Sequence, residues 1–379
     1  MKRILYLVTD DWSFWSHRLA LADAAKKHGY EVFVVTQKGE FADRIESRGF
    51  KLYPFSICRS FGSVLQELKG MINLARLYKK IKPDLVNNIA LKPIIFGSVS
   101  ARISSVPYVI NTYTGLGNIF ISRSLMSNFF MLIVVPFMSL ILKGKRFYSV
   151  VQNADDMKEL IKCGLINSKS VSLIRGSGVD TSVFKFTQEA ETNSPVVIFA
   201  SRFLRDKGII EFVEAVKLLK QTGSVARFVL VGNLDKANPT SINDTELNDW
   251  IEQDLVEWWG YRDDMSEVFK QAHIVCLPSY REGLPKVLLE AASSGRPIIT
   301  TDVPGCREVV IDGINGYLVP VKDPVKLADA INLLLESPDL RRQMGAAGRR
   351  RVEENFDINR INSATVDLYE KLLTSASIL

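Results

Sequence analysis

Two glutamates, Glu282 and Glu290, stand eight positions apart around the start of an amphipathic run that predicts a helix. At about 100° per residue, eight positions make a little over two helical turns, so both carboxylates are expected to point toward one end of a single cleft. A predicted strand over 274–279 precedes them. A strand, a glycine-containing loop and a helix N-terminus together form a binding site for an anion, because the N–H groups at the start of the helix are free to donate. Carboxylates beside such a site suit a neutral polyol, because each accepts hydrogen bonds from hydroxyl groups.

A second pair of residues lies in the segment SRFLRDKG, which follows a predicted strand over 196–200. Its Arg202 and Lys207 lie five positions apart. Preorganised cations stabilise the negative charge that develops when a sugar–phosphate bond breaks. Arginine offers a planar fork to phosphate oxygens, and lysine offers a point charge. The alternative is that both are surface bases before a helix, as the two glutamates alone would suit a solvated helix face.

Taken together, SRFLRDKG, REGLP and DGINGYLV resemble the signature of the retaining glycosyltransferases of family 4. That family has the GT-B fold, two Rossmann-like α/β domains facing each other across a cleft, and uses nucleotide-sugar donors. The resemblance covers nearly the whole chain. It implies that Arg202 and Lys207 bind the donor diphosphate and that these two, with Glu282, are the catalytic residues. It also implies donor sugar and ribose contacts from Glu282, Gly283, Leu284, Pro285 and Glu290.

Other motifs supply candidate contacts to the donor and the acceptor. Gly178 in IRGSGVD is expected to let the backbone approach the donor diphosphate, with a plain turn as the alternative. Thr114 and Gly115 in NTYTGLGNIF follow a predicted strand and are expected near the acceptor, where many family members carry a histidine instead. Asn153 follows another predicted strand and is expected to point into the cleft, where it would contact the acceptor. His17 follows an aromatic loop at the start of the first predicted helix. It is expected either to contact the acceptor or simply to occupy the N-terminal position of that helix.

These departures from the family pattern resemble the subgroup that builds lipid-linked oligosaccharides. That subgroup includes transferases that add N-acetylgalactosamine to undecaprenyl-diphosphate-linked bacillosamine, and their O-antigen or capsule relatives. The shared features are SHRLALADAAKKHGYEV, TGLG, QNADD and SYREGLP. The resemblance implies a UDP-sugar donor, with an N-acetylhexosamine as the sugar, and a polyprenyl-diphosphate-linked sugar as the acceptor. No cofactor and no metal ion is expected, because the paired aspartates lack the Asp-x-Asp spacing of the other glycosyltransferase fold.

Charge is divided unevenly along the chain. Residues 1–190 carry 26 Lys and Arg against 14 Asp and Glu, whereas residues 191–379 carry 22 against 28. The N-terminal half is therefore expected to face an anionic partner. Nucleic acid is not expected, because no recognition helix, zinc finger or RNP-like motif is present. Four scattered cysteines without CxxC spacing, and a chain that starts directly on a strand, indicate a cytosolic protein.

An uncharged stretch over 124–142 is followed by the basic KGKR over 143–146, and this pattern indicates a segment that could bind an anionic membrane surface. Its length borders on that of a transmembrane helix, but Pro136 and several polar residues argue against spanning. A buried crossover helix and a helix in the membrane interface are the other two alternatives. We predict a cytoplasmic enzyme, peripheral to the inner face of the cell membrane, that contacts the membrane through 124–146.

Short apolar runs alternate with helical patterns throughout, which predicts two parallel α/β domains. The predicted division is 1–188, 189–357 and a final helix over 358–379 that packs back on the first domain. The predicted function is a retaining glycosyltransferase of bacterial surface or protein glycan synthesis. The alternatives are a UDP-sugar 2-epimerase on the same fold and a non-catalytic sugar-nucleotide-binding partner of a membrane complex.

Overall fold

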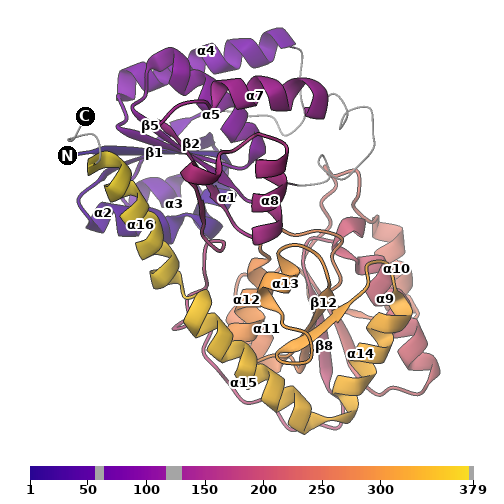
Figure 1. Ribbon diagram of the computed structural model, residues 1–379. Coiled ribbons are helices and arrows are strands. Elements are labelled where there is room, and N and C mark those ends of the chain that lie inside the picture. Colours follow the sequence, from indigo (N-terminus) through magenta and orange to yellow (C-terminus); the bar gives the residue numbers. More distant parts are fainter. Residues whose placement is uncertain (56–63, 117–129, 375–379) are drawn as a thin grey trace. The chain divides into compact units, whose positions relative to one another are not determined.

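The computed structural model describes residues 1–55, 64–116 and 130–374. These residues form two compact α/β units (Figure 1). The first unit comprises Met1–Ser177 and Asn359–Leu379, and the second comprises Gly178–Ile358. Each unit is built on its own parallel sheet, as the alternation of strands and helices in the sequence predicts.

The first unit contains a seven-stranded sheet with the order β3-β2-β1-β4-β5-β6-β7. Its central strands are apolar runs buried on both faces, as a sheet covered by helices on both sides requires. Leu5 of β1 lies opposite Phe33 of β2 and Val86 of β4. The strands are β1 (Arg3–Asp10), β2 (Glu31–Gln37), β3 (Lys51–Pro54), β4 (Leu85–Ile89), β5 (Tyr108–Tyr113), β6 (Phe147–Val151) and β7 (Val171–Leu173).

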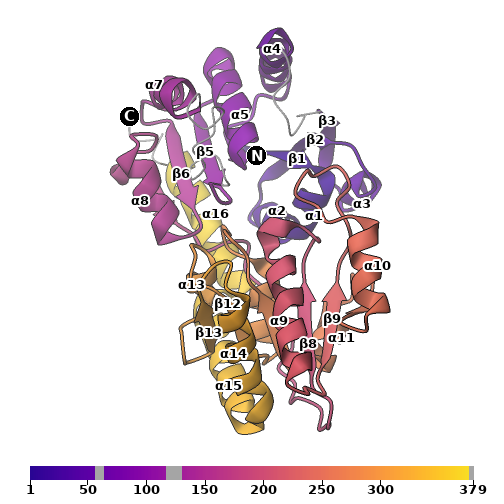
Figure 2. The same cartoon turned by 90° about the vertical axis from the view of Figure 1, so that its right-hand side faces the viewer.

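Helices cover both faces of this sheet. They are α1 (Asp11–His17), α2 (Leu19–Lys27), α3 (Ala42–Ser47), α4 (Val64–Ile81), α5 (Leu91–Ser104), α7 (Val135–Ile141), α8 (Ala154–Lys162) and α16 (Ile358–Thr374). Apolar side chains of α4, α5, α7 and α8 pack on one face, and those of α1, α2, α3 and α16 on the other. Figure 2 shows α4, α5 and α7 side by side on the first of these faces.

A short π-helical segment, η2 (Phe130–Val134), leads directly into α7. Of the apolar stretch identified in the sequence, residues 124–129 lie outside the described part of the chain. From 130 to 141 the stretch is helical. Val135 and Met138 are buried in the core of the first unit, whereas Phe137 and Leu140 are exposed. The described part of the stretch is therefore not a fully buried helix. One side of it packs on the core of the first unit, and the other side exposes apolar residues.

The last long helix, α16, packs on the first unit. Its Tyr369 hydroxyl accepts a hydrogen bond from the amide of Asn87 at 2.8 Å and lies 3.2 Å from the hydroxyl of Tyr6. Val366, Leu368 and Tyr369 join the same apolar cluster as residues of β1. Burial raises the pKa of Tyr369 to about 12, so its hydroxyl stays protonated at neutral pH.

The compact units divide between Ser177 and Gly178, whereas the division predicted from the sequence lies between 188 and 189. The intervening segment packs on the second unit through the Phe184 ring and through its backbone carbonyl groups. Ser293 Oγ donates a hydrogen bond to the Phe184 carbonyl at 2.6 Å, and Phe184 packs against the core of the second unit. These long-range contacts, which the local sequence does not reveal, assign the segment to the second unit.

The second unit contains a six-stranded parallel sheet with the order β10-β9-β8-β11-β12-β13. Its strands are β8 (Val196–Ala200), β9 (Arg227–Val231), β10 (Glu257–Trp258), β11 (Ile274–Leu277), β12 (Ile298–Thr301) and β13 (Gly316–Val319). Its helices are η4 (Arg205–Lys207, a 3-10 turn), α9 (Ile209–Gln221), α10 (Asp244–Glu252), α11 (Met265–Gln271), α12 (Lys286–Ser293), α13 (Cys306–Val309), α14 (Pro324–Glu336) and α15 (Pro338–Asn355). A single large apolar cluster joins the strands to these helices.

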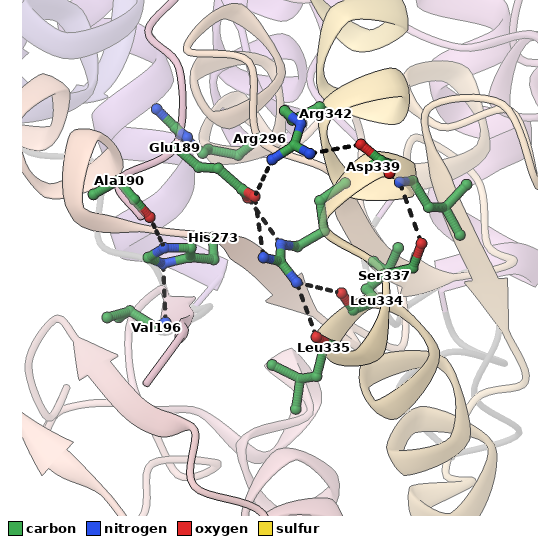
Figure 3. A network of polar contacts seen from close by, with 12 residues as sticks. Glu189, Ala190, Val196, His273, Arg296, Leu334, Leu335, Ser337, Asp339 and Arg342 are labelled. Atoms are coloured by element: carbon green, nitrogen blue, oxygen red, sulfur yellow. Dashed lines mark hydrogen bonds and ion pairs between the residues drawn. The ribbon is translucent and has the colours of Figure 1, made fainter. Parts of the chain in front are cut away.

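A buried polar network lies beside the strand β8 in the second unit (Figure 3). The Glu189 carboxylate pairs with the Arg341 guanidinium at 2.8 Å, and both side chains are almost fully buried. His273 Nδ1 accepts a hydrogen bond from the N–H of Val196 at 3.0 Å, and Nε2 lies 2.8 Å from the Ala190 carbonyl oxygen. The proton therefore resides on Nε2. Burial lowers the pKa of His273, so this histidine is a neutral structural residue.

Replacing Glu189 by alanine is expected to lower the free energy of unfolding by about 3–5 kcal/mol, because it leaves the Arg341 guanidinium buried without its counterion. Denaturant unfolding followed by circular dichroism measures the change. The matched control is Asp329→Ala, which breaks the exposed Lys326–Asp329 pair and is expected to cost less than about 0.5 kcal/mol. Equal losses for the two variants would contradict a stabilising role for the buried pair.

Candidate active site

Two segments far apart in the sequence meet at the carboxyl edge of the second sheet. β8 and β11 are neighbouring parallel strands, so the segments that follow them emerge side by side. The N–H of Tyr280, after β11, donates to the Asp206 carbonyl, after β8, at 2.9 Å. Ser279 Oγ donates to the same carbonyl at 3.1 Å. The motif containing Lys207 and the motif containing Glu282 therefore form one site.

At the centre of this site, Lys207 and Glu282 form an ion pair. Lys207 Nζ lies 2.5 Å from Glu282 Oε1, and the two side chains are only 19% and 12% exposed. Restricted access to water strengthens such electrostatic interactions and leaves both charged heads in fixed positions. A cation that suits a phosphate and a carboxylate that suits sugar hydroxyls thus lie in direct contact. This juxtaposition is the geometric core of the site.

Glycines hold both segments in place. Gly208 has φ +77°, and a Cβ there would lie 2.1 Å from the Pro278 carbonyl oxygen, so the turn that ends η4 requires glycine. Gly305 has φ +82°, and its Cβ would lie 2.6 Å from the Glu282 carbonyl oxygen and 2.5 Å from that of Gly283. Gly305 is not among the residues predicted from the sequence. The only local signal was the Pro-Gly dipeptide of a turn, which does not reveal that this turn supports the Glu282 loop.

Arg202 takes its position from a residue that the sequence analysis did not identify. Its guanidinium Nη1 lies 2.7 Å from Asp235 Oδ2, in the segment after β9. Arg202 is half-exposed, so its fork remains accessible to an incoming anion. The same segment is attached to η4, because Thr240 Oγ1 donates to Asp206 Oδ1 at 3.0 Å. Arg205 lies between Arg202 and Lys207 in the sequence. It pairs with Glu246 of α10 at 2.5 Å, so its side chain is directed toward that helix.

Glu282 lies in the loop before α12, not on the helix itself. The helix begins at Lys286 after Pro285, whose backbone is extended, with ψ 111°. A proline also disfavours helical conformation for the residue before it, here Leu284. The helical spacing argument for Glu282 and Glu290 therefore does not apply. The loop backbone from Gly283 to Pro285 instead connects the ion pair to the start of α12.

Glu290 lies in the second turn of α12 and is almost completely buried. Burial raises the pKa of its carboxyl group, and the Lys286 ammonium at 3.4 Å partly opposes this effect. Tyr280, two positions before Glu282 in the sequence, donates its hydroxyl hydrogen to the buried Glu211 at 2.6 Å. Burial and this carboxylate raise the pKa of Tyr280 well above its usual value. The phenol is thus a fixed donor that orients the start of the Glu282 loop.

Gly178 packs in a turn beside the last residues of the second unit. It has φ +72°, and a Cβ there would lie 2.7 Å from Ile358 Cα. The adjacent Val179 pairs with this segment, donating to the Phe356 carbonyl at 2.9 Å and accepting from the N–H of Ile358 at 3.0 Å. These contacts explain why the position needs glycine. Its contact with a donor diphosphate stays a prediction.

The candidate acceptor residues lie in the first unit, after three of its strands. Thr114 and Gly115 directly follow β5, and Gly115 has φ +123°. His17 ends α1, after β1, with its ring edge-on to Trp12 at 5.6 Å between centroids. Asn153 follows β6 and caps α8: its Oδ1 accepts from the Asp156 N–H at 2.7 Å, and its amide donates to the Asp156 carboxylate at 3.0 Å. Asn153 is fully buried, so its side chain is occupied by helix capping.

Two features are absent from the part of the chain that the structure describes, a membrane-spanning helix and a metal-binding cluster. None of the helices there combines the length and the apolar character needed to cross a membrane. Likewise, residues 1–55, 64–116 and 130–374 contain no group of three or more His, Cys, Asp or Glu side chains arranged to hold a metal ion.

Comparisons with known proteins agree with this geometry. Residues 180–351 match the family model described as glycosyl transferases group 1, and residues 3–138 match the model described as glycosyl transferase 4-like. An N,N'-diacetylbacillosaminyl-diphospho-undecaprenol alpha-1,3-N-acetylgalactosaminyltransferase of Campylobacter jejuni is 28% identical, over 98% of this chain and 99% of that protein. A UDP-Gal:alpha-D-GlcNAc-diphosphoundecaprenol alpha-1,3-galactosyltransferase of Escherichia coli is 24% identical, over 89% of this chain and 87% of that protein.

Solved structures show the same fold. Sucrose-phosphate synthase from Thermosynechococcus elongatus has a TM-score of 0.81 at 19% identity, with 99% of this chain and 100% of that chain covered. The Anabaena protein HepE, in complex with UDP and glucose, has a TM-score of 0.77 at 19% identity, covering 98% and 100%. The fold and the family models together define the class: the protein is a glycosyltransferase of the GT-B fold. Within that class, the C-terminal part of the chain is similar to the group 1 glycosyl transferases and the N-terminal part to the glycosyl transferase 4-like proteins.

Proposed function

We propose that this enzyme transfers an N-acetylhexosamine from a UDP-sugar to a polyprenyl-diphosphate-linked sugar, with retention of the anomeric configuration. The observation that carries the proposal is the contact between Lys207 and Glu282 at the carboxyl edge of β8 and β11. The names of the Campylobacter and Escherichia relatives, both of which act on sugars linked to undecaprenyl diphosphate, support the acceptor class. The proposed setting is the synthesis of a bacterial surface or protein glycan.

In the proposed reaction, the bond between the sugar C1 and the diphosphate oxygen breaks, and a bond from C1 to an acceptor oxygen forms on the same face. Arg202 and Lys207 stabilise the charge that develops on the departing UDP. Glu282 orients the donor sugar through its hydroxyls, and Glu290 accepts hydrogen bonds from the ribose. The acceptor proton passes to the departing phosphate oxygen. No metal ion enters this scheme, so we propose that activity survives EDTA treatment.

Donor affinity is expected to fall as the pH is lowered. The fall is expected to begin at a pH above the ordinary pKa range of a glutamate carboxyl group. Burial raises the pKa of Glu290, so its carboxylate is protonated earlier than an exposed one and accepts fewer hydrogen bonds from ribose. Calorimetric titration with UDP between pH 5 and 8 measures the profile. Glu290→Gln is expected to bind more weakly at neutral pH and to lose this pH dependence. A variant profile parallel to that of the wild type would exclude Glu290 as its origin.

We further propose that the enzyme acts at the cytoplasmic face of the cell membrane, as a peripheral protein that contacts the bilayer through 124–146. The exposed apolar side of α7, followed by Lys143 and Lys145, supports this proposal. Such contact would bring the first unit, with Thr114 and Gly115, close to an acceptor whose lipid is anchored in the membrane.

The test is to offer the purified enzyme four UDP-sugars with a polyprenyl-diphosphate-linked amino sugar, and to measure UDP release and acceptor mass. The donors are UDP-N-acetylgalactosamine, UDP-N-acetylglucosamine, UDP-galactose and UDP-glucose. A gain of one N-acetylhexosamine mass, with an α-linkage by NMR, is the expected result. Interconversion of UDP-sugars without acceptor would replace the proposal by an epimerase. Tight UDP binding without turnover on any acceptor would replace it by a non-catalytic binding partner.

A further inference from the structure

An exposed apolar row on α4 has no role in the site described above. Leu65, Leu68 and Ile72 are 79%, 50% and 46% exposed. Their spacing of three and four positions places them on one side of the helix. Leu74 and Tyr78 are buried in the core beneath. Isolated exposed leucines are ordinary, but three large apolar residues in line on one helix indicate a contact surface.

A matching row lies on η2 and α7, on the same face of the first sheet. Leu132, Ile133, Phe137 and Leu140 are all at least half exposed. α4 and α7 both contact α5, and Figure 2 shows them on either side of it. The two rows therefore belong to one layer of helices. We call these seven residues the docking face.

Basic residues follow the apolar row in the sequence on both segments. On α4 the apolar row is followed by Arg76, Lys79 and Lys80, all exposed. The α7 row is followed by Lys143 and Lys145, also exposed. α4 connects β3 to β4 and α7 connects β5 to β6, and the strands of this sheet are parallel, so each helix runs antiparallel to the strands. The apolar ends consequently lie toward the carboxyl edge of the strands, and the basic ends toward the amino edge.

Acidic charge is nearly absent from this surface. The single acidic residue of α4 is Glu67, which pairs with Lys92 of α5 at 3.0 Å, and both side chains are largely buried. Beside the end of α7, a hollow of about 810 Å³ is lined by Lys143, Lys145 and Lys169, together with hydroxyl groups. Its size and charge suit an anionic headgroup.

We propose that α4 and α7 form a two-helix docking face for a bilayer containing anionic phospholipid. The apolar row on each helix contacts the boundary between headgroups and acyl chains, and the lysines and Arg76 contact lipid phosphates. This inference rests on the proposed lipid-linked acceptor, and it adds α4 and a defined orientation to the contact through 124–146. In that orientation the carboxyl edge of the first sheet, where Thr114 and Gly115 lie, is brought to the bilayer surface.

Vesicle co-sedimentation of the full-length enzyme tests the docking face. Vesicles of phosphatidylethanolamine with phosphatidylglycerol are compared with vesicles of phosphatidylcholine. The double variant Leu68→Ser/Ile72→Ser is expected to lower partitioning into the anionic vesicles at least about tenfold. Lys79→Glu/Lys80→Glu is expected to lower it by a similar factor, because each basic residue adds electrostatic attraction to anionic lipid. The matched control, Ile251→Ser/Leu333→Ser, removes exposed apolar residues from helices of the second unit and is expected to bind as the wild type does.

Wild-type binding by the α4 variants, or equal binding of the wild-type enzyme to both kinds of vesicle, would overturn the proposal. A concentration-dependent dimer of the wild type that dissociates in Leu68→Ser/Ile72→Ser would also overturn it, by assigning the face to a second copy of the chain. Transfer to a short-chain, water-soluble acceptor diphosphate is measured in parallel and is expected to be unchanged in the α4 variants. Absence of this transfer in the wild type would count against the proposed function, independently of the docking face.

Discussion

Glu282→Gln is expected to lower kcat by about a hundredfold or more, while the dissociation constant of UDP changes by less than about threefold. Glutamine keeps the size and one acceptor oxygen of the side chain but loses its charge. Lys207 Nζ, now 2.5 Å from the carboxylate, loses its counterion, and the hydroxyls of the donor sugar lose a charged acceptor. UDP alone lacks the sugar, so its affinity is expected to stay near that of the wild type. Steady-state transfer kinetics and UDP titration separate the two effects.

The matched control is Glu246→Gln in the same unit. Glu246 also pairs with a cation of the SRFLRDKG segment, at 2.5 Å, but its partner is Arg205, which is directed toward α10. The control is expected to keep kcat within about twofold, because an exposed ion pair contributes little. A similar loss in both variants would mean that kcat reports the general charge of the segment. Unchanged turnover in Glu282→Gln would remove Glu282 from the proposed role.

The sheets and the central contact of the site follow from local sequence patterns. Buried apolar runs such as 196–200 and 274–277 alternate with amphipathic helices, and this alternation requires parallel strands with helices on both faces. Residues that follow such strands must gather at one edge of the sheet. The pairing of Lys207 with Glu282 is a consequence of β8 and β11 being neighbours, as the order of a doubly wound sheet demands.

What the sequence did not reveal depends on contacts between distant segments. Asp235 reaches Arg202 from the segment after β9, and Gly305 supports the Glu282 loop from the turn after β12. Nothing in the composition near either residue indicates its partner. The capping role of Asn153 was available from sequence, because an asparagine three positions before an acidic residue at a helix start is a capping pattern. The prediction of an acceptor contact for Asn153 rested instead on its place after a strand.

Lys207→Ala is expected to lower kcat/KM by about a thousandfold, the largest effect of any single change in the second unit. The variant removes a cation aimed at the departing diphosphate. It also leaves the Glu282 carboxylate, which is only 12% exposed, without its ion-pair partner. Lys207→Arg is expected to recover part of the loss, since the charge returns but the planar fork does not reproduce a compact ammonium. Arg205→Ala is the matched control, and it is expected to change kcat/KM by less than about threefold, because its side chain pairs with Glu246.

The double variant Lys207→Ala/Glu282→Gln distinguishes a joint role from two separate ones. Residues that act as a unit show strongly non-additive losses, so the double variant is expected to be about as impaired as Lys207→Ala alone. Additive losses would mean that the lysine serves the diphosphate and the glutamate serves the sugar without either depending on the other. In that case their 2.5 Å contact would be a property of the site before the donor binds, and the reaction would use the two side chains independently.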